Sequence, residues 1–96
     1  MDLGPPTLRD LDELERTLTD SHERPVLLFK HSYACGVSAE ALDELRSHIE
    51  ERRSSEVQYA MVTVQTHRDV CNTITERLGV RHETPQAILV RGGRAV

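Results

Sequence analysis

The stretch FKHSYACGVSAEALDEL, from Phe29 to Leu45, joins the end of an apolar run to the beginning of a helical pattern. The run VLLFK, from Val26 to Lys30, is short and almost uniformly apolar, which is typical of a buried strand. Apolar residues then recur every three or four positions, which predicts a helix from about Cys35 to Arg53. A lone Cys35 therefore stands at the expected helix start, and Ser38 occupies the position where a two-thiol redox site would have its second cysteine.

Helical and strand patterns also flank this stretch on both sides. On the N-terminal side, Thr7 is expected to cap a helix whose leucines recur at positions 8, 11, 14 and 18. On the C-terminal side, VQYAMVTV, from Val57 to Val64, predicts a second strand. The apolar positions from Val70 to Leu78 predict a third helix that ends at Gly79, because glycine readily adopts the left-handed conformation that closes a helix.

The rest of the chain predicts two further strands. QAILV, from Gln86 to Val90, is expected to form a third strand, and Gly92-Gly93 a tight turn into a short fourth one. With right-handed crossovers, this order of elements predicts an α/β fold with a four-stranded mixed sheet flanked by helices. It resembles a thioredoxin-like fold, with residues 1–96 as a single domain and with the usual C-terminal helix expected to be missing.

Composition narrows the classes of function. The chain of 96 residues is long enough for one small core, which its 38% of hydrophobic residues can fill. Its 12 basic and 16 acidic residues are interspersed, with a formal charge of −4, which argues against a nucleic-acid partner. The N-terminal MDLGPPTLRDLDEL lacks an apolar run, so neither a signal peptide nor a membrane anchor is expected. These features predict a cytoplasmic protein without nucleic-acid or membrane partners.

In a reducing compartment, Cys35 and Cys71 are expected to be free thiols rather than a disulfide. The thiolate is the nucleophilic form of cysteine, and a free cysteine, with a pKa of about 8.5, is mostly protonated at neutral pH. The N–H groups and the dipole at a helix start favour the thiolate, so Cys35 is the candidate catalytic nucleophile. Lys30 and His31, just upstream, either add positive potential or are ordinary polar residues at a strand end.

Ser38 has two interpretations. Its hydroxyl is able to donate a hydrogen bond to the Cys35 sulfur, or it is simply a small helix residue near an interface. In either case it cannot form a disulfide. A mixed disulfide on Cys35 would therefore have to be resolved by an outside thiol.

Thr84-Pro85 is the second candidate element of the site. In a thioredoxin-like fold, a proline just before the third strand lies opposite the cysteine in a cis peptide bond. That geometry presents the main chain of Thr84 to an extended disulfide substrate, much as a sheet edge binds a peptide. The alternative is a trans proline that only begins a strand.

Cys71 falls on the predicted buried face of the third helix, so its first interpretation is a core residue and its second a resolving thiol. The cysteines and the five histidines lack the paired spacing of a metal site. No metal and no cofactor are therefore expected.

These segments, together with VTVQTHRDVCNTITERLGVRHETPQAILVRGGRAV, resemble the monothiol bacilliredoxin family, small thioredoxin-like proteins of the bacillithiol redox system. The resemblance covers about Val26 to Val96 and rests on KHS before a lone cysteine, on Ser38, and on V-x-H-E-T-P-Q at positions 80–86. It implies that Cys35 removes bacillithiol from oxidised proteins, with Thr84-Pro85 as the substrate-binding pair. The implied partners are S-bacillithiolated proteins and a low-molecular-weight thiol, bacillithiol being the co-substrate. Many members have a proline after the cysteine, where this chain has Gly36.

Two other functions stay open at this point. CGVS, from Cys35 to Ser38, differs by one residue from the CGFS of monothiol glutaredoxins, which hold glutathione and often an iron–sulfur cluster. Those proteins usually carry a Gly-Gly-x-Asp segment after the fourth strand, whereas Gly92-Gly93 is predicted to precede it. The third possibility is a non-catalytic thioredoxin-like interaction module in which Cys35 is an ordinary thiol.

Bacillithiol carries a malate group whose two carboxylates favour cationic or N–H partners. Lys30, Arg81 and Arg91 flank the predicted site in the sequence and are candidates for this role. Each is alternatively a solvated surface residue.

Overall fold

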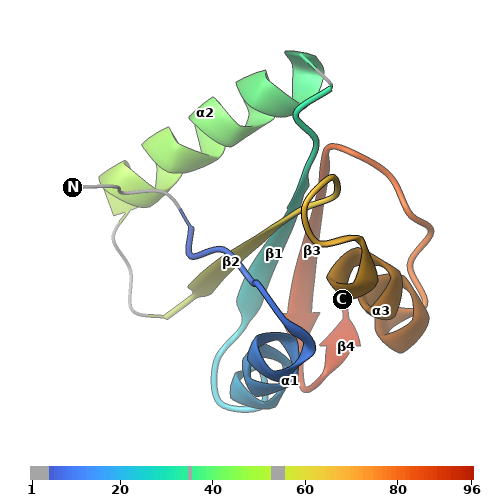
Figure 1. The fold of residues 1–96 in the computed structure, drawn as a ribbon. Helices are drawn as coiled ribbons and strands as arrows, with labels where there is room; N and C mark the ends of the chain where they lie inside the picture. The colour runs from blue at the N-terminus through green and yellow to red at the C-terminus, as the bar shows by residue number, and fades with distance from the viewer. Residues whose placement is uncertain (1–4, 35, 53–55) are drawn as a thin grey trace.

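The sheet has four strands in the order β2-β1-β3-β4 (Figure 1). Their bounds are β1 Val26–His31, β2 Gln58–Thr63, β3 Gln86–Arg91 and β4 Arg94–Ala95. β1 pairs in parallel with β2 and antiparallel with β3, and β3 pairs antiparallel with β4. This is the mixed sheet that the sequence predicts. The structure is a computed structural model that describes residues 5–34, 36–52 and 56–96.

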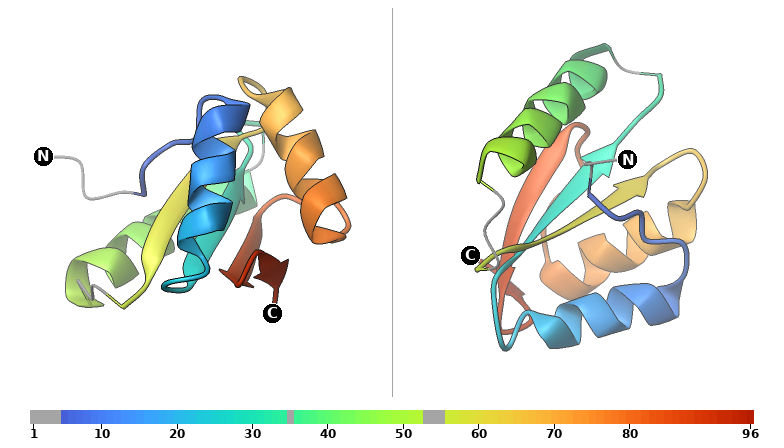
Figure 2. Two further views of the ribbon diagram at one scale, coloured as in Figure 1. Left: turned by 90° about the horizontal axis from the view of Figure 1, so that it is seen from below. Right: turned by 90° about the vertical axis from the view of Figure 1, so that its left-hand side faces the viewer.

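Three helices within these described ranges cover the sheet: α1 (Leu11–Asp20), α2 (Gly36–Arg52) and α3 (Arg68–Leu78). α1 and α3 lie together on one face, and α2 lies on the other (Figure 2). Within the same ranges, none of the helices has the length and apolar character needed to cross a membrane. The described residues therefore form three layers, helix, sheet and helix.

β1 divides its side chains between the two outer layers, because successive residues of a strand point to opposite faces. Val26 and Leu28 are buried in the core that α1 and α3 cover. Lys30 is next on that face and reaches a side chain of α3. Phe29 and His31 point the other way, and His31 contacts a side chain of α2. The last two residues of β1 thus serve different layers.

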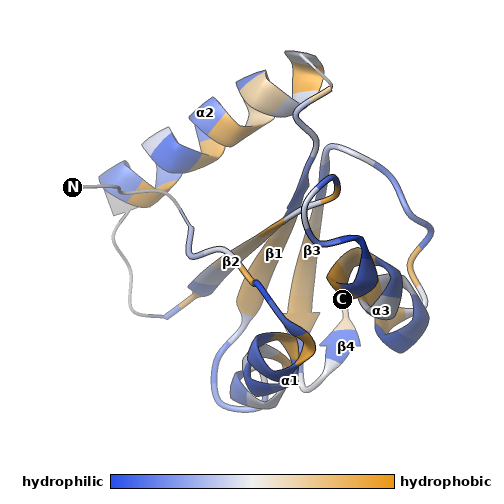
Figure 3. Cartoon of the chain, in the orientation of Figure 1, coloured by the Kyte–Doolittle hydropathy of each residue, from blue (hydrophilic) through white to orange (hydrophobic). Residues whose placement is uncertain are grey.

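The main hydrophobic core lies between the sheet and the pair α1 and α3. Figure 3 shows hydrophobic residues along β1 and β3, and a mainly hydrophilic α1 with a narrow hydrophobic stripe. Residues buried in this core include Leu14, Leu18, Val62, Val70, Ile74, Ile88 and Val90. On the other face of β3, Ala87 and Leu89 are exposed.

α1 begins at Leu11, so the prediction that Thr7 caps this helix is wrong. The N-cap is Asp10, whose carboxylate accepts a hydrogen bond from the Glu13 main-chain N–H at 2.8 Å. Thr7 and Leu8 instead run beside β2, where Leu8 N donates to the carbonyl of Met61 at 2.7 Å. An aspartate at the cap satisfies an unpaired N–H and also places negative charge at the positive end of the helix dipole.

α3 ends where the sequence predicts. Gly79 has a positive φ of 64°, and its N–H donates to the Thr75 carbonyl at 3.0 Å. A residue with a Cβ is disfavoured in this conformation, which explains the glycine. From there the chain runs through residues 80–85 to the start of β3.

Replacing the cap tests the corrected start of α1. Asp10→Ala should lower the free energy of unfolding by about 1 kcal/mol, because it leaves an N–H of the first turn without its partner. Urea unfolding at neutral pH measures this change, with Thr7→Ala as the matched variant. An equal or larger loss in Thr7→Ala would restore Thr7 as the cap.

Candidate active site

The candidate site lies at the end of the sheet where β1 leads into α2. His31 is the last residue of β1, and the antiparallel β3 begins at this same end with Gln86. In Figure 1 the segment between α3 and β3, drawn in orange, reaches this end of the sheet. Cys35 lies outside the described residues. Its sequence neighbours are described, and α2 begins one position after it, at Gly36.

The loop that precedes Cys35 has its main-chain donors bound by side-chain oxygens. Ser32 N donates to Ser38 Oγ at 3.0 Å, Tyr33 N to Gln65 Oε1 at 3.1 Å, and Ala34 N to Ser32 Oγ at 3.3 Å. Each of these N–H groups is thereby satisfied within the loop or by its close neighbours. They are not left free to stabilise a negative charge at the site.

Gln65, in the segment between β2 and α3, holds this loop with both ends of its carboxamide. Its Oε1 accepts from Tyr33 N, and its Nε2 donates to Ser32 Oγ at 2.8 Å. Sequence reasoning missed Gln65, because an exposed glutamine in a connecting segment gives no pattern to detect. Only the parallel pairing of β1 with β2 brings it beside the loop.

His31 and Ser38 form the buried polar pair of the site. His31 Nδ1 lies 2.9 Å from Ser38 Oγ, and both residues are almost fully buried. Burial lowers the pKa of His31, the positive charge of Arg46 lowers it further, and hydrogen bonding with Ser38 raises it in part. The imidazole is therefore neutral at neutral pH. The expectation that His31 adds positive potential near Cys35 is corrected, because burial disfavours the imidazolium.

Ser38 uses its hydroxyl mainly to hold the end of β1. Its oxygen accepts the Ser32 N–H and also contacts His31 Nδ1. These contacts explain why a small polar residue is buried in the first turn of α2. A hydrogen bond from Ser38 to the Cys35 sulfur stays a prediction, since Cys35 is outside the described residues.

The N-terminal end of α2 would supply positive potential to a group at position 35. The first turn of this helix contains no acidic residue, and the helix runs for 17 residues. The first N–H groups of a helix and its dipole stabilise a nearby anion, and an acidic side chain there would oppose it. The sequence position just before Gly36 is thus favourable for a thiolate.

Thr84-Pro85 lies in the segment that leads into β3. The peptide bond between these residues is cis, as the sequence predicts. Both residues are half-buried, and the next residue, Gln86, pairs with Lys30 of β1. Thr84 is therefore placed at the same end of the sheet as His31. Its role toward a substrate is a prediction.

The predicted cations are distributed differently from the expectation. Arg81 is exposed in the segment before Thr84-Pro85, where its carbonyl accepts from Gln86 Nε2 at 2.9 Å. Lys30 is completely buried, so it neither faces a small ligand in solution nor is a solvated surface residue. Both interpretations of Lys30 are wrong, because its place in the strand points it toward α3.

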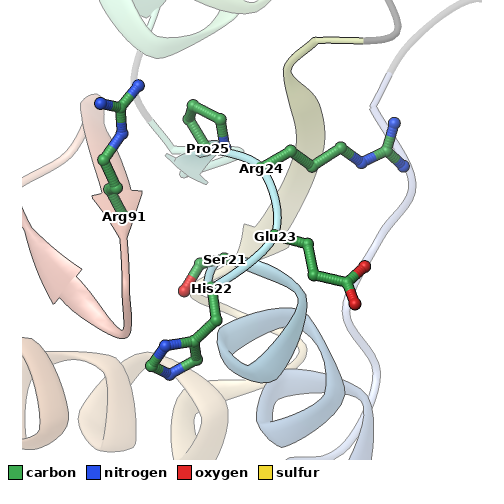
Figure 4. A pocket seen from close by; sticks show the side chains of 6 residues that line it. All are labelled: Ser21, His22, Glu23, Arg24, Pro25 and Arg91. Carbon is green, nitrogen blue, oxygen red and sulfur yellow. The ribbon is translucent and has the colours of Figure 1, made fainter.

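Arg91 is at the opposite end of β3, so its predicted place beside the site is also wrong. Arg91 lines a hollow of about 220 Å³ together with His22, Arg24 and neighbouring residues. Figure 4 shows these side chains around the segment between the end of α1 and the start of β1. Arg91 is close to Thr84-Pro85 in sequence, but the length of β3 separates them in space.

Cys71 is buried in α3, with 1% of its surface exposed, as the first interpretation predicts. Burial raises the pKa of its thiol, while the nearby Lys30 and Arg68 lower it in part. A thiol in this environment is a poor nucleophile at neutral pH. Among the described residues, no three His, Cys, Asp or Glu side chains gather as ligands for a metal ion.

A mixed four-stranded sheet with α1 and α3 on one face and α2 on the other defines a thioredoxin-like fold. A solved structure described as having a thioredoxin fold is 30% identical, with a TM-score of 0.81 over 96% of this chain and 78% of that chain. Residues 6–96 match the sequence profile of the family described as monothiol bacilliredoxin BrxC, and the chain belongs to this family.

More distant structures share the fold alone. Thioredoxin from Fasciola hepatica is 16% identical, with a TM-score of 0.77 over 95% of this chain and 81% of that chain. Thioredoxin from Trypanosoma brucei brucei is 11% identical, with a TM-score of 0.77 over 100% of this chain and 77% of that chain. The family and the fold together indicate a thiol redox protein.

The burial of His31 predicts a loss of stability in mild acid. The unfolded chain protonates this histidine as the pH falls below about 6.5, whereas the native state resists protonation because its pKa is lowered. The free energy of unfolding should therefore fall as the pH decreases from 7 toward 5. In His31→Gln this contribution is absent, so urea unfolding should give a flatter pH dependence. Equal slopes in the two proteins would contradict the assignment.

Removing the carboxamide of Gln65 should loosen the loop before Cys35. In Gln65→Leu the Tyr33 amide loses its acceptor, and its hydrogen exchange should become up to about tenfold faster, the effect of one net hydrogen bond. NMR-detected exchange measures this, with the Val64 amide, which donates to His31 O, as internal reference. Gln58→Leu, at the other end of β2, is the matched control. An unchanged exchange rate of the Tyr33 amide in Gln65→Leu would show that Gln65 does not hold this loop.

Proposed function

We propose that this protein is a monothiol thiol–disulfide oxidoreductase of the cytoplasm that removes bacillithiol from mixed disulfides on oxidised proteins through Cys35. Its membership of the monothiol bacilliredoxin family supports this proposal. The observation that carries it is the first turn of α2, which begins one residue after Cys35, contains no acidic side chain and places Ser38 where a second thiol would be. A helix start of this kind favours a thiolate.

The first step is attack by the Cys35 thiolate on the bacillithiol sulfur of the mixed disulfide. A bond forms between Cys35 and bacillithiol, the bond to the target protein breaks, and the target cysteine leaves as a thiolate. In the second step a free low-molecular-weight thiol, as thiolate, attacks the bacillithiol sulfur on Cys35. The product is a small disulfide, and Cys35 returns to its thiolate form.

An outside thiol is needed to resolve a disulfide on Cys35, because neither Ser38 nor Cys71 is suited to do so. Ser38 has no thiol chemistry, and its hydroxyl already binds the end of β1. Cys71 belongs to α3, on the sheet face opposite α2, and is buried with a raised pKa. Neither is suited to resolve a disulfide on Cys35.

Substrate recognition is assigned to the segment before β3. The main-chain N–H and C=O of Thr84 are available to an extended substrate segment, because no hydrogen bond to them is made by another described residue. The exposed Arg81 is the cation best placed for the malate carboxylates of bacillithiol. Lys30 and Arg91 are excluded from this role by burial and by distance along β3.

The glutathione alternative is less well supported. Gly92-Gly93 forms the turn between β3 and β4, and the N–H groups of these two glycines donate to Ser21 at 2.8 Å each. This turn lies at the end of β3 away from Gln86 and Thr84-Pro85. It is therefore not beside the candidate site, where a glutathione end group would need it.

Variants of the two cysteines test the mechanism. Cys35→Ser should abolish removal of bacillithiol from a modified protein, whereas Cys71→Ser should keep most of the activity because Cys71 is a core residue. Release of the target thiol, followed by mass spectrometry, measures this. Equal losses in both variants, with both proteins folded, would identify Cys71 as a resolving thiol.

Three measurements separate this function from the glutaredoxin and interaction-module alternatives. Protein modified with bacillithiol should react faster than protein modified with glutathione, and purified protein should lack the visible absorption of an iron–sulfur cluster. Faster turnover with glutathione would favour the glutaredoxin function. A Cys35 pKa at or above about 8.5 would favour a non-catalytic interaction module.

A further inference from the structure

Lys30 is the single lysine of the chain, since every other basic residue is an arginine. It is completely buried and continues the core-facing row that begins with Val26 and Leu28. No carboxylate of the described residues lies within ion-pair distance of it. A buried ammonium without a counter-charge is costly in free energy, so the presence of a lysine at this position calls for a specific explanation.

The Lys30 side chain connects two segments that are distant in sequence. Its Nζ donates to Thr75 Oγ1 of α3 at 3.2 Å and lies 3.3 Å from Nδ1 of His82, in the segment before β3. The Thr75 hydroxyl donates to the Cys71 carbonyl at 3.3 Å, so its oxygen is the acceptor toward Lys30. Burial lowers the pKa of Lys30, and the nearby Cys71 raises it in part. Lysine fits such a place because its compact ammonium forms several hydrogen bonds from a flexible stem.

Residues 80–85 have few other attachments. Val80 packs against the hydrophobic core at one end, and Gln86 Nε2 donates to the Arg81 carbonyl. No main-chain hydrogen bond joins residues 80–85 to the rest of the described chain. Among the hydrogen bonds of the described residues, those of Lys30 with His82 and with Thr75 join the middle of this segment to α3.

We propose that Lys30 is a positioning residue that holds the segment 80–85, through His82, so that the Thr84 main chain is presented to the substrate. This role rests on the proposed function of the site, which it deepens by naming what orders its substrate-binding segment. Lys30 itself does not touch substrate. Its effect is on substrate affinity, whereas the thiolate of Cys35 depends on the other face of the sheet, at the start of α2.

The first test uses Lys30→Met, which keeps an unbranched side chain one atom shorter than lysine and removes the N–H donors. The KM for a bacillithiolated protein should rise about tenfold, the effect of one hydrogen bond to a charged group, with kcat and the pKa of Cys35 unchanged. The stability of the fold should not decrease, because a buried charge is replaced by an apolar group. A merely structural lysine would give the opposite result, lower stability with an unchanged KM.

The second test asks whether Lys30 acts through His82. His82→Phe should raise KM by a similar factor, and the double variant should be no worse than either single one, because the two changes break one contact. His22→Phe, at the other end of the sheet, is the matched control and should leave KM unchanged. Additive effects of Lys30→Met and His82→Phe would overturn the proposal.

A third measurement does not depend on activity. Since the chain has one lysine, lysine labelled with ¹⁵N gives one side-chain Nζ signal, which should shift in His82→Phe and stay in place in His22→Phe. Backbone ¹⁵N relaxation should show increased motion of residues 81–84 in Lys30→Met. An unmoved Nζ signal or an unchanged segment would overturn the proposal, whereas a wild-type protein that fails to release bacillithiol would overturn the proposed function alone.

Discussion

The alternation of side chains at the end of β1 is the constraint on which the site depends. Lys30 and His31 are neighbours in sequence, yet the pleat of the strand sends Lys30 toward α3 and His31 toward α2. One residue therefore reaches the segment before β3, and the next orders the loop before Cys35. A shift of register by a single position would exchange these two polar groups and disrupt both sides at once.

The distribution of main-chain donors gives the site its electrostatic character. The N–H groups of residues 32–34 are bound to Ser38, Gln65 and Ser32. The helix start at Gly36 is then the nearby source of positive potential, because burial keeps His31 neutral and hides Lys30. A thiolate at position 35 would depend on backbone dipoles more than on side-chain charge.

The sequence predicted the elements whose residues follow a simple period. The buried strands, the stop of α3 at Gly79 and the burial of Cys71 all follow from local pattern and agree with the structure. Thr7 failed as a cap because Asp10, three residues later, is also a good cap and carries the favourable charge. A local pattern does not decide between two capping residues that are three positions apart. The pairing of Thr7 with β2 leaves Asp10 as the cap.

The side-chain contacts of the site were harder to predict for a different reason. Gln65 and His82 stand in connecting segments, where no hydrophobic period assigns them a direction, and both acquire their partners from the way strands are paired. The predictions for Lys30 and Arg91 are wrong because closeness in sequence does not ensure closeness in space. Arg91 lies at the end of β3 opposite to Gln86, and the buried position of Lys30 in β1 keeps its cation away from solvent.

The hydroxyl of Ser38 joins the end of β1 to the first turn of α2. Its oxygen accepts the Ser32 N–H, and its single proton has His31 Nδ1 as one acceptor, with the sulfur of Cys35 as a second one if the predicted contact between Ser38 and Cys35 is made. When the neutral imidazole carries its proton on Nε2, Ser38 donates to Nδ1 and has no proton left for a thiolate. When the proton is on Nδ1, the imidazole donates to Ser38 and the hydroxyl proton is free to bind sulfur. If Ser38 approaches the Cys35 sulfur as the sequence predicts, the tautomer of the neutral His31 would decide whether the Ser38 hydroxyl donates a hydrogen bond to that sulfur.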